Sequence, residues 1–232
     1  MQKDVKNSTT VYFADELLEN EKELAKQFSE GCLELESLLL YCWQNGILTR
    51  GCCTGHRTKR YSLVDKTATG GHGYISFDID NKEFAKQLSL NILRNDFLKN
   101  VSCRKYDEIL VKSGEIGFSK WNHRKEGWFG ISYYFPNTYS HKISGQVFNE
   151  LKNCLDNSLN TNLQPQNKFE NFVCYMIDEI FLSTHRDYHM YLNLSTMEFE
   201  KNHDFIQLKH LYKKKLDKEK NELKQKTMCQ EK

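Results

Sequence analysis

Apolar side chains near the start of the chain recur every three or four residues, a spacing that places them on one face of an α-helix. This pattern predicts a first helix over residues 15–28 and a second over about 33–44. The second helix has an apolar stripe formed by Leu35, Leu38, Leu39 and Cys42. Asn45 and Gly46 follow it, and this pair is typical of a helix C-terminus because both residues tolerate the left-handed backbone conformation.

Further along the chain, two segments alternate apolar and polar residues, which is the period of a β-strand with one buried face. They are GYISFDI, residues 73–79, and GWFGISYYF, residues 127–135. Their inward positions are Ile75, Phe77, Ile79, Phe129, Ile131, Tyr133 and Phe135. Shorter extended segments are expected at residues 47–53, 61–64, 108–113 and 116–120.

Three pairs of residues have the spacing of a capping box, in which the first side chain accepts from the N3 amide and the second reaches back. They are Asp80 with Glu83, Asn167 with Glu170, and Ser195 with Glu198. These pairs predict a helix after the first alternating strand, a very apolar helix through Phe181 and a long, basic C-terminal helix. A further helix, starting at Ser144, carries an apolar stripe of Val147, Leu151, Cys154 and Leu155.

The order of these elements predicts an α+β fold, with an antiparallel or mixed sheet covered by helices and a mainly helical C-terminal third. The chain has 232 residues, two prolines and no low-complexity linker, so no sharp domain boundary is expected. The best candidate boundary lies at residues 160–167. It separates an α+β domain, residues 1–160, from a helical segment, residues 161–232, which can belong to the same domain.

Composition favours a cytoplasmic protein. No apolar run approaches the roughly 18 residues that span a bilayer, and the first 20 residues lack the apolar core of a secretory signal. We therefore expect no membrane association. The eight cysteines are expected to be reduced, because disulfide frameworks belong to short exported chains.

The net charge of +2 hides an uneven distribution. Residues 13–37 are strongly acidic, whereas positive charge gathers in residues 50–66. The basic residues there are Arg50, Arg57, Lys59, Arg60 and Lys66, against a single Asp65. This asymmetry allows an anionic partner at the basic segment, and it equally allows the acidic helix to cover that segment.

The segment TRGCCTGHRTKRY, residues 49–61, is the candidate site, and three kinds of chemistry fit it. Zinc is one, with Cys52, Cys53, His56 and His72 as ligands. Adjacent cysteines in a strand point to opposite faces, however, and this spacing is unusual for a zinc site. A thiolate nucleophile is the second, with Cys53 activated by His56 and by the neighbouring positive charge.

The third kind of site binds a ligand or partner without catalysing a reaction. Backbone amides near the glycines could hold an anion, and basic side chains could add charge-assisted hydrogen bonds to phosphate. The residues assigned to this role are Arg50, Gly55, Arg57, Lys59, Arg60 and His72. Stacking surfaces for a nucleic acid could come from Trp121, Trp128, Tyr133 and Tyr134. The chain has no P-loop, no dinucleotide-binding fingerprint and no RNA-binding aromatic motif.

LTRGCCTGH, followed by a strand and by DIDNKEFAKQLSLNILRNDF, resembles the wybutosine-pathway tRNA methyltransferase family over about residues 46–98. Cys53, Thr54 and Gly55 stand at positions of that family's Ser-Cys-Ser-Gly-Arg loop, and His56 replaces its arginine. The resemblance implies S-adenosylmethionine as cofactor and a tRNA substrate. The helical C-terminal third has no counterpart in it.

The lysine- and asparagine-rich composition also resembles proteins of phages and mobile elements, such as anti-CRISPR inhibitors. We therefore expect a non-catalytic intracellular module that binds or inhibits a nucleic acid or nucleoprotein complex. The alternative is a thiol- or S-adenosylmethionine-dependent enzyme that modifies RNA or a nucleotide. An enzyme should gather Cys53, His56 and His72 in a concave pocket, whereas a binding module should present an extended basic or aromatic patch.

The sequence predicts that all eight cysteines are free thiols in the folded protein. Thiol titration of the denatured chain under non-reducing conditions should find close to the full count. Two or more stable disulfides would contradict the expected reducing compartment.

Overall fold

A computed structural model describes the protein over residues 14–29, 31–54, 72–101, 113–121, 128–136, 141–184 and 186–230. Its elements are α1 (Ala14–Phe28), α2 (Leu33–Gln44), β1 (Leu48–Cys53), β2 (His72–Ile79), α4 (Lys82–Arg94), α5 (Asp96–Asn100), β3 (Glu115–Trp121), β4 (Trp128–Pro136), α6 (His141–Asn160), α7 (Lys168–Leu182), β5 (Tyr188–Asn193), β6 (Glu198–Phe199) and α8 (His203–Gln230). The strand expected at residues 61–64 lies outside the described ranges, as does most of the segment expected at 108–113.

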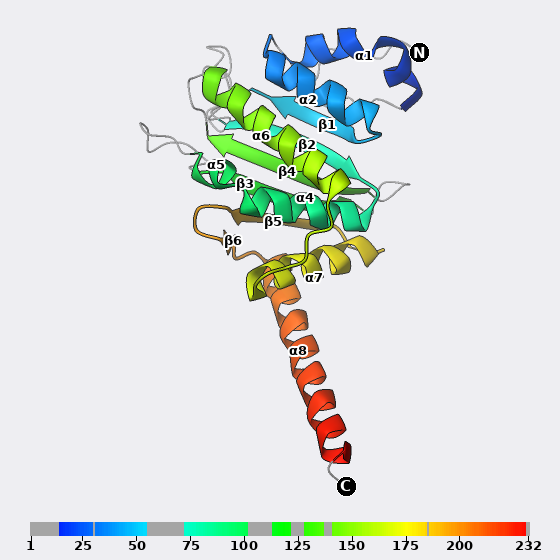
Figure 1. The fold of residues 1–232 in the computed structure, drawn as a ribbon, viewed down its shortest axis with the longest axis vertical. Helices are drawn as coiled ribbons and strands as arrows, with labels where there is room; N and C mark the ends of the chain where they lie inside the picture. The colour runs from blue at the N-terminus through cyan, green and yellow to red at the C-terminus, as the bar shows by residue number, and fades with distance from the viewer. Residues whose placement is uncertain are drawn as a thin grey trace.

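The strands form one sheet in the order β1-β2-β4-β3-β5-β6, and every neighbouring pair is antiparallel. The contact of β2 with β4 joins the β1–β2 pair to the β3–β4 pair. Figure 1 shows α4 and α6 lying over one face of the sheet, with α2 next to α6. This arrangement is the α+β class that the sequence predicts, with an antiparallel sheet. Among the described helices, none combines the length and the apolar character needed to cross a membrane.

The face of the sheet under the helices is the apolar core. Ile75 and Phe77 of β2 and Ile131 and Tyr133 of β4 are all 0% exposed. Each occupies an inward position of the alternating pattern, so that prediction is confirmed. The Tyr133 hydroxyl donates to the backbone oxygen of Leu98 at 2.9 Å, which gives this buried polar group a partner.

Asparagine side chains cap the helices that follow the sheet strands and the α6–α7 connection. Asn167 Oδ1 accepts from the Glu170 amide at 2.9 Å, which confirms the predicted start of α7. In α4 the capping residue is Asn81, which accepts from the Phe84 amide at 3.0 Å. This helix therefore begins one residue later than the pattern at Asp80 predicts.

The predicted start of the C-terminal helix at Ser195 is wrong. Asn193 Oδ1 accepts from the amides of Ser195 and Thr196 at 3.0 and 3.1 Å, and residues 194–197 form the turn between β5 and β6. The helix begins only after Asn202, whose side chain caps the first turn of α8. The local spacing matches a capping box, but the Asn193 side chain organises a hairpin turn instead.

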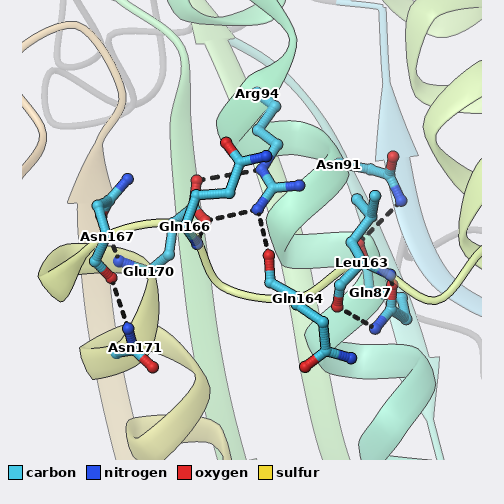
Figure 2. A network of polar contacts seen from close by, with 9 residues as sticks. All are labelled: Gln87, Asn91, Arg94, Leu163, Gln164, Gln166, Asn167, Glu170 and Asn171. Carbon is cyan, nitrogen blue, oxygen red and sulfur yellow. Dashed lines mark hydrogen bonds and ion pairs between the residues drawn. The ribbon is translucent and has the colours of Figure 1, made fainter.

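Side chains of α4 form hydrogen bonds with the connection between α6 and α7 (Figure 2). Gln87 pairs with the backbone of Leu163 in both directions, accepting from its amide at 2.7 Å and donating to its carbonyl at 3.1 Å. Arg94 donates to the Gln164 carbonyl at 2.7 Å and, through Nε and Nη2, to the Glu170 carboxylate at 3.1 and 2.6 Å. These contacts hold residues 160–167 against α4, and this is the stretch that the sequence suggests as a domain boundary.

The first part of α8 packs on the rest of the described protein. Leu208 is buried. The centroid of the Tyr212 ring lies 4.9 Å from that of Tyr175 and 5.3 Å from that of Phe172. Residues 213–225 are exposed, and Figure 1 shows α8 extending away from the sheet and the other helices. The two strands before α8 belong to the common sheet, because β5 pairs with β3 and β6 pairs with β5.

Phe77→Ala should lower the free energy of unfolding by about 3 to 5 kcal/mol, because it removes a fully buried ring. Leu182→Ala, at a position that is 70% exposed, should change it by less than about 0.5 kcal/mol. Denaturant titration measures both values. A loss below about 1 kcal/mol for Phe77→Ala would contradict the assignment of this strand face to the core.

The Arg94 guanidinium and the Gln166 amide lower the pKa of Glu170 from its ordinary value of 4.5. Such a carboxyl stabilises the folded state above its unfolded pKa, and this contribution is lost as the pH falls through the folded pKa. We therefore expect the free energy of unfolding to decrease as the pH falls below about 4.5. Glu170→Gln should flatten this part of the pH profile and cost about 1 to 3 kcal/mol at neutral pH, because Arg94 loses its charged partner.

Denaturant titrations across this pH range provide the measurement. Glu83→Gln is the control, because the Glu83 carboxylate is 67% exposed and its removal should leave the profile nearly unchanged. An unaltered acid profile in Glu170→Gln would refute the link between this ion pair and acid stability.

Candidate functional site

The second face of the sheet carries polar and aromatic side chains. On each strand these residues alternate with the core positions, so they point away from the helices. We call this surface the open face. Its side chains belong to Arg50, Tyr74, Ser76, Asp78, Ser119, Trp121, Ser132, Tyr134, His189 and Tyr191. All of these residues lie on strands.

The strand register sorts the open face into rows that run across the sheet. The first row is Cys53, Tyr74, Tyr134, Glu115 and Asn193. The second row is Gly51, Ser76, Ser132, Gly117 and Tyr191, and the third is Asp78, Gly130, Ser119 and His189. Neighbouring strands are about 4.8 Å apart, so a row from β1 to β5 is about 19 Å long. Glycine and serine occupy four of the five positions of the second row and two of the four positions of the third. These small residues form a trough between the tyrosines of the first row and Trp121, which lies beyond the third row.

Two glycines let tyrosine rings lie down against the sheet. A Cβ atom at Gly117 would stand 2.9 Å from the ring of Tyr134 and 3.2 Å from that of Tyr191. At Gly51 it would stand 3.4 Å from the ring of Tyr74. The ring centroid of Tyr134 is 6.0 Å from that of Tyr74 and 5.8 Å from that of Tyr191. The three rings therefore form a connected aromatic cluster along the trough, in which Tyr134 is tilted by 31° from Tyr74 and meets Tyr191 edge to face at 61°.

The trough deepens beside these rings into a hollow of about 320 Å³. The floor of the hollow is formed by Ser76, Ser119, Gly130 and Ser132. The hydroxyl oxygens of Ser76 and Ser132 are hydrogen bonded at 2.7 Å. On the side away from the tyrosines stand Trp121 and His189, whose rings meet edge to face with centroids 4.2 Å apart. The hollow thus has a hydroxyl-bearing floor and aromatic walls.

The described open face carries an ion pair between Arg50 and Asp78, and burial changes the pKa values of Tyr134 and Glu115. Arg50 Nη2 lies 2.5 Å from Asp78 Oδ2 at the β1 end of the trough. Burial raises the pKa of Tyr134, and the neighbouring Tyr191 hydroxyl raises it further. Tyr134 is therefore neutral near pH 7, and its hydroxyl can donate or accept a hydrogen bond. Burial also raises the pKa of Glu115.

The structure divides the cysteines of the sequence-predicted segment between the two faces of β1. Arg50 lies on the open face and lines the hollow. Cys53 is opposite Tyr74 in the register and shares its face. Cys52 points the other way, with its Sγ 3.8 Å from the backbone oxygen of Phe28. The expectation that adjacent cysteines face opposite sides is thereby confirmed.

The other predicted site residues fall largely outside the described ranges. Gly55, His56, Arg57, Lys59 and Arg60 belong to residues 55–71, which are outside them. His72 begins β2, and only its backbone is described. Within the described part of the chain, no three His, Cys, Asp or Glu residues are grouped as metal ligands would be. The zinc site and the Cys53–His56 pair stay predictions.

The described cysteines form no disulfide with one another. Those whose side chains the structure describes are Cys32, Cys42, Cys52, Cys53, Cys154 and Cys174. Burial raises the pKa of Cys154 to about 12 and that of Cys174 to about 11, so both are neutral thiols near pH 7. A buried neutral thiol behaves as a small apolar side chain and is a poor nucleophile.

Of the four aromatic residues that the sequence suggests as stacking surfaces, Trp121 and Tyr134 lie on the open face. Tyr133 is 0% exposed on the core side of β4, so its suggested stacking role is wrong. The side chain of Trp128 falls outside the described part of the structure. Sequence reasoning missed Tyr74, Ser76, Ser119, Ser132, His189 and Tyr191. The sequence does contain a signal for this face. The outward positions of the two alternating strands hold mostly Tyr, Ser, Gly and Trp, whereas an exposed strand face usually holds charged residues.

Comparison of the chain with protein families, with curated proteins and with solved structures found no match. A fold alone does not imply a function, and the chemistry of the open face is the feature of this protein that points to one.

Proposed function

We propose that this protein is a non-catalytic module that binds single-stranded nucleic acid along the trough of the open face. The observation that carries this proposal is the row order, in which Tyr74, Tyr134 and Tyr191 border a strip of glycine and serine on β1, β2, β4 and β3. A nucleic-acid strand needs aromatic surfaces for its bases and a path free of bulky side chains for its backbone.

The tyrosine rings supply the stacking surfaces. Tyr191 is 37% exposed, and Tyr74 and Tyr134 are partly exposed next to it. Stacking of a base on an aromatic side chain contributes about 1 to 3 kcal/mol and tolerates any base, because every base has a π face. Three adjoining rings along a trough of about 19 Å therefore suit a short run of unpaired nucleotides better than a rigid duplex.

Positive charge in the sequence segments between these strands supports an anionic partner. Residues 55–71 lie between β1 and β2 in the sequence and contain Arg57, Lys59, Arg60 and Lys66 against a single Asp65. Residues 122–127, between β3 and β4, add Arg124 and Lys125 against Glu126. Lys and Arg side chains neutralise phosphates and release counterions, which makes nucleic-acid binding favourable and dependent on salt.

The enzyme alternative has less support from the geometry. A thiol-dependent enzyme would place its reactive thiol at the ligand site. Cys53 shares the open face but is not one of the residues that line the hollow. The hollow is lined by hydroxyls, aromatic rings and glycines, together with Arg50 and His189, and no cysteine is among the described residues that line it.

Tyr191→Ala and Tyr74→Ala should each weaken binding of a fluorescent, mixed-sequence single-stranded oligonucleotide by about 5-fold to 100-fold, as expected from the loss of one stacked base. Fluorescence anisotropy at low salt measures the dissociation constant, with RNA and DNA strands tested separately. A duplex of the same sequence should bind more weakly, because its bases are already stacked on each other.

Tyr41→Ala is the matched control. Tyr41 is a partly exposed tyrosine on α2, away from the open face, with its hydroxyl bonded to Asp156 at 2.8 Å. The proposal fails if the unmodified protein binds neither strand, or if all three substitutions weaken binding equally. Melting temperatures of the variants separate loss of binding from loss of folding.

A further inference from the structure

We infer that the hollow at the centre of the open face accepts one nucleobase, which leaves the stack of its neighbours and inserts between the tyrosine row and Trp121. This inference rests on the proposed function and adds a specific subsite to it. The remaining bases of the strand would stack on the tyrosine rings, whereas this one would be held by hydrogen bonds from the floor of the hollow.

The size of the hollow fits a single base with its sugar. Its volume of about 320 Å³ is near the lower end of the range of about 300 to 1,000 Å³ that is typical of small-molecule sites. The hollow exists because the neighbouring strands β2, β4 and β3 place small residues side by side, namely Ser76 and Ser132 in the second row and Gly130 and Ser119 in the third.

A floor of glycine and serine makes the sheet less stable, and the binding of a ligand there would account for these residues. Glycine weakens a strand interior and often marks the close approach of a ligand or of another group. Tyrosine rings fill the space above Gly51 and Gly117. Gly130 and the serines line the hollow, where a flat ring could approach the backbone of the sheet closely.

The polar groups of the hollow match the edge of a base. Nucleobases carry hydrogen-bond donors and acceptors side by side on one edge. The Ser76 and Ser132 hydroxyls are hydrogen bonded to each other at 2.7 Å, and each oxygen can still accept a hydrogen bond from a donor on the base. The Tyr134 hydroxyl, which interacts with Ser132 and Tyr191, stands beside this pair. Arg50 lines the same hollow, and a phosphate beside the inserted base could approach its guanidinium.

Ligand-observed NMR with the full chain tests the subsite, using the four 5′-mononucleotides as probes and ribose 5-phosphate as the control without a base. We expect at least one mononucleotide to bind and ribose 5-phosphate not to bind. Ser76→Leu, which places a larger side chain on the floor, should weaken mononucleotide binding at least about 10-fold. Ser76→Ala keeps the space but removes one hydroxyl, and its loss should be smaller.

Thr184→Leu is the matched control, because it also replaces a small hydroxyl-bearing side chain by leucine, at an exposed position between α7 and β5. It should leave binding unchanged. Equal binding of ribose 5-phosphate and the mononucleotides, or unchanged binding in Ser76→Leu, would overturn the base subsite. In that case a loss of oligonucleotide binding in Tyr191→Ala would still support the proposed function.

An oligonucleotide with one abasic position, moved along the strand, gives the second test. If a base inserts into the hollow, one abasic position should lower the affinity more than the others, and Ser76→Leu should abolish that difference. A uniform response to every abasic position would overturn the subsite and leave sequence-tolerant stacking as the mode of binding. Binding of mononucleotides without binding of any oligonucleotide would support the subsite and defeat the proposed function.

Discussion

The antiparallel pairing of β2 with β4 is the contact on which both the core and the candidate site depend. It sets Phe77 opposite Ile131 on the helix side, and it sets Ser76 opposite Ser132 on the open face. Because side chains alternate along a strand, a slip of one residue in this register would turn the core residues outward and the serines inward. The burial of Phe77 and Ile131 therefore fixes the geometry of the open face.

This dependence explains how a binding surface can be built without a dedicated loop or motif. The apolar half of each alternating strand provides the free energy of folding, since it is buried under α4 and α6. The outward-facing residues of these strands do not pack in the core, so their side chains can serve binding. Tyrosine rings seated on Gly51 and Gly117 then convert a flat sheet into a trough with an aromatic border.

Much of the fold could be predicted from the sequence because its signals are local. Alternation in β2 and β4, the apolar stripe of α2 and the cap at Asn167 all depend on residues close in the chain, and the structure confirms them. The capping pattern at Ser195 is misleading, because a competing side chain, Asn193, uses the same amides for a turn. Where a helix starts depends on which polar side chain accepts hydrogen bonds from the amides at that position.

The candidate site could be predicted only in part. Arg50 can be found from the sequence because it belongs to an unusual local segment, whereas Tyr74, Tyr191 and His189 come from strands far apart in the chain. Their proximity depends on strand order and register, and no short stretch encodes either. Aromatic residues at alternating positions also have two interpretations, since Tyr133 packs in the core and Tyr134 borders the trough.

The projection of α8 has a consequence for the local stability of the protein. Its contacts with α7 reach Tyr212 and Lys215, whose Nζ lies 5.0 Å from the centroid of the Tyr175 ring, and residues 216–225 are exposed. Backbone hydrogen bonds in this last part are protected mainly by the helix itself, so fraying from the C-terminal end opens them without unfolding the sheet. Amide hydrogen exchange along α8 should therefore form a gradient, fast near residue 225 and slow near Leu208, and exchange in β2 and β4 should be independent of it.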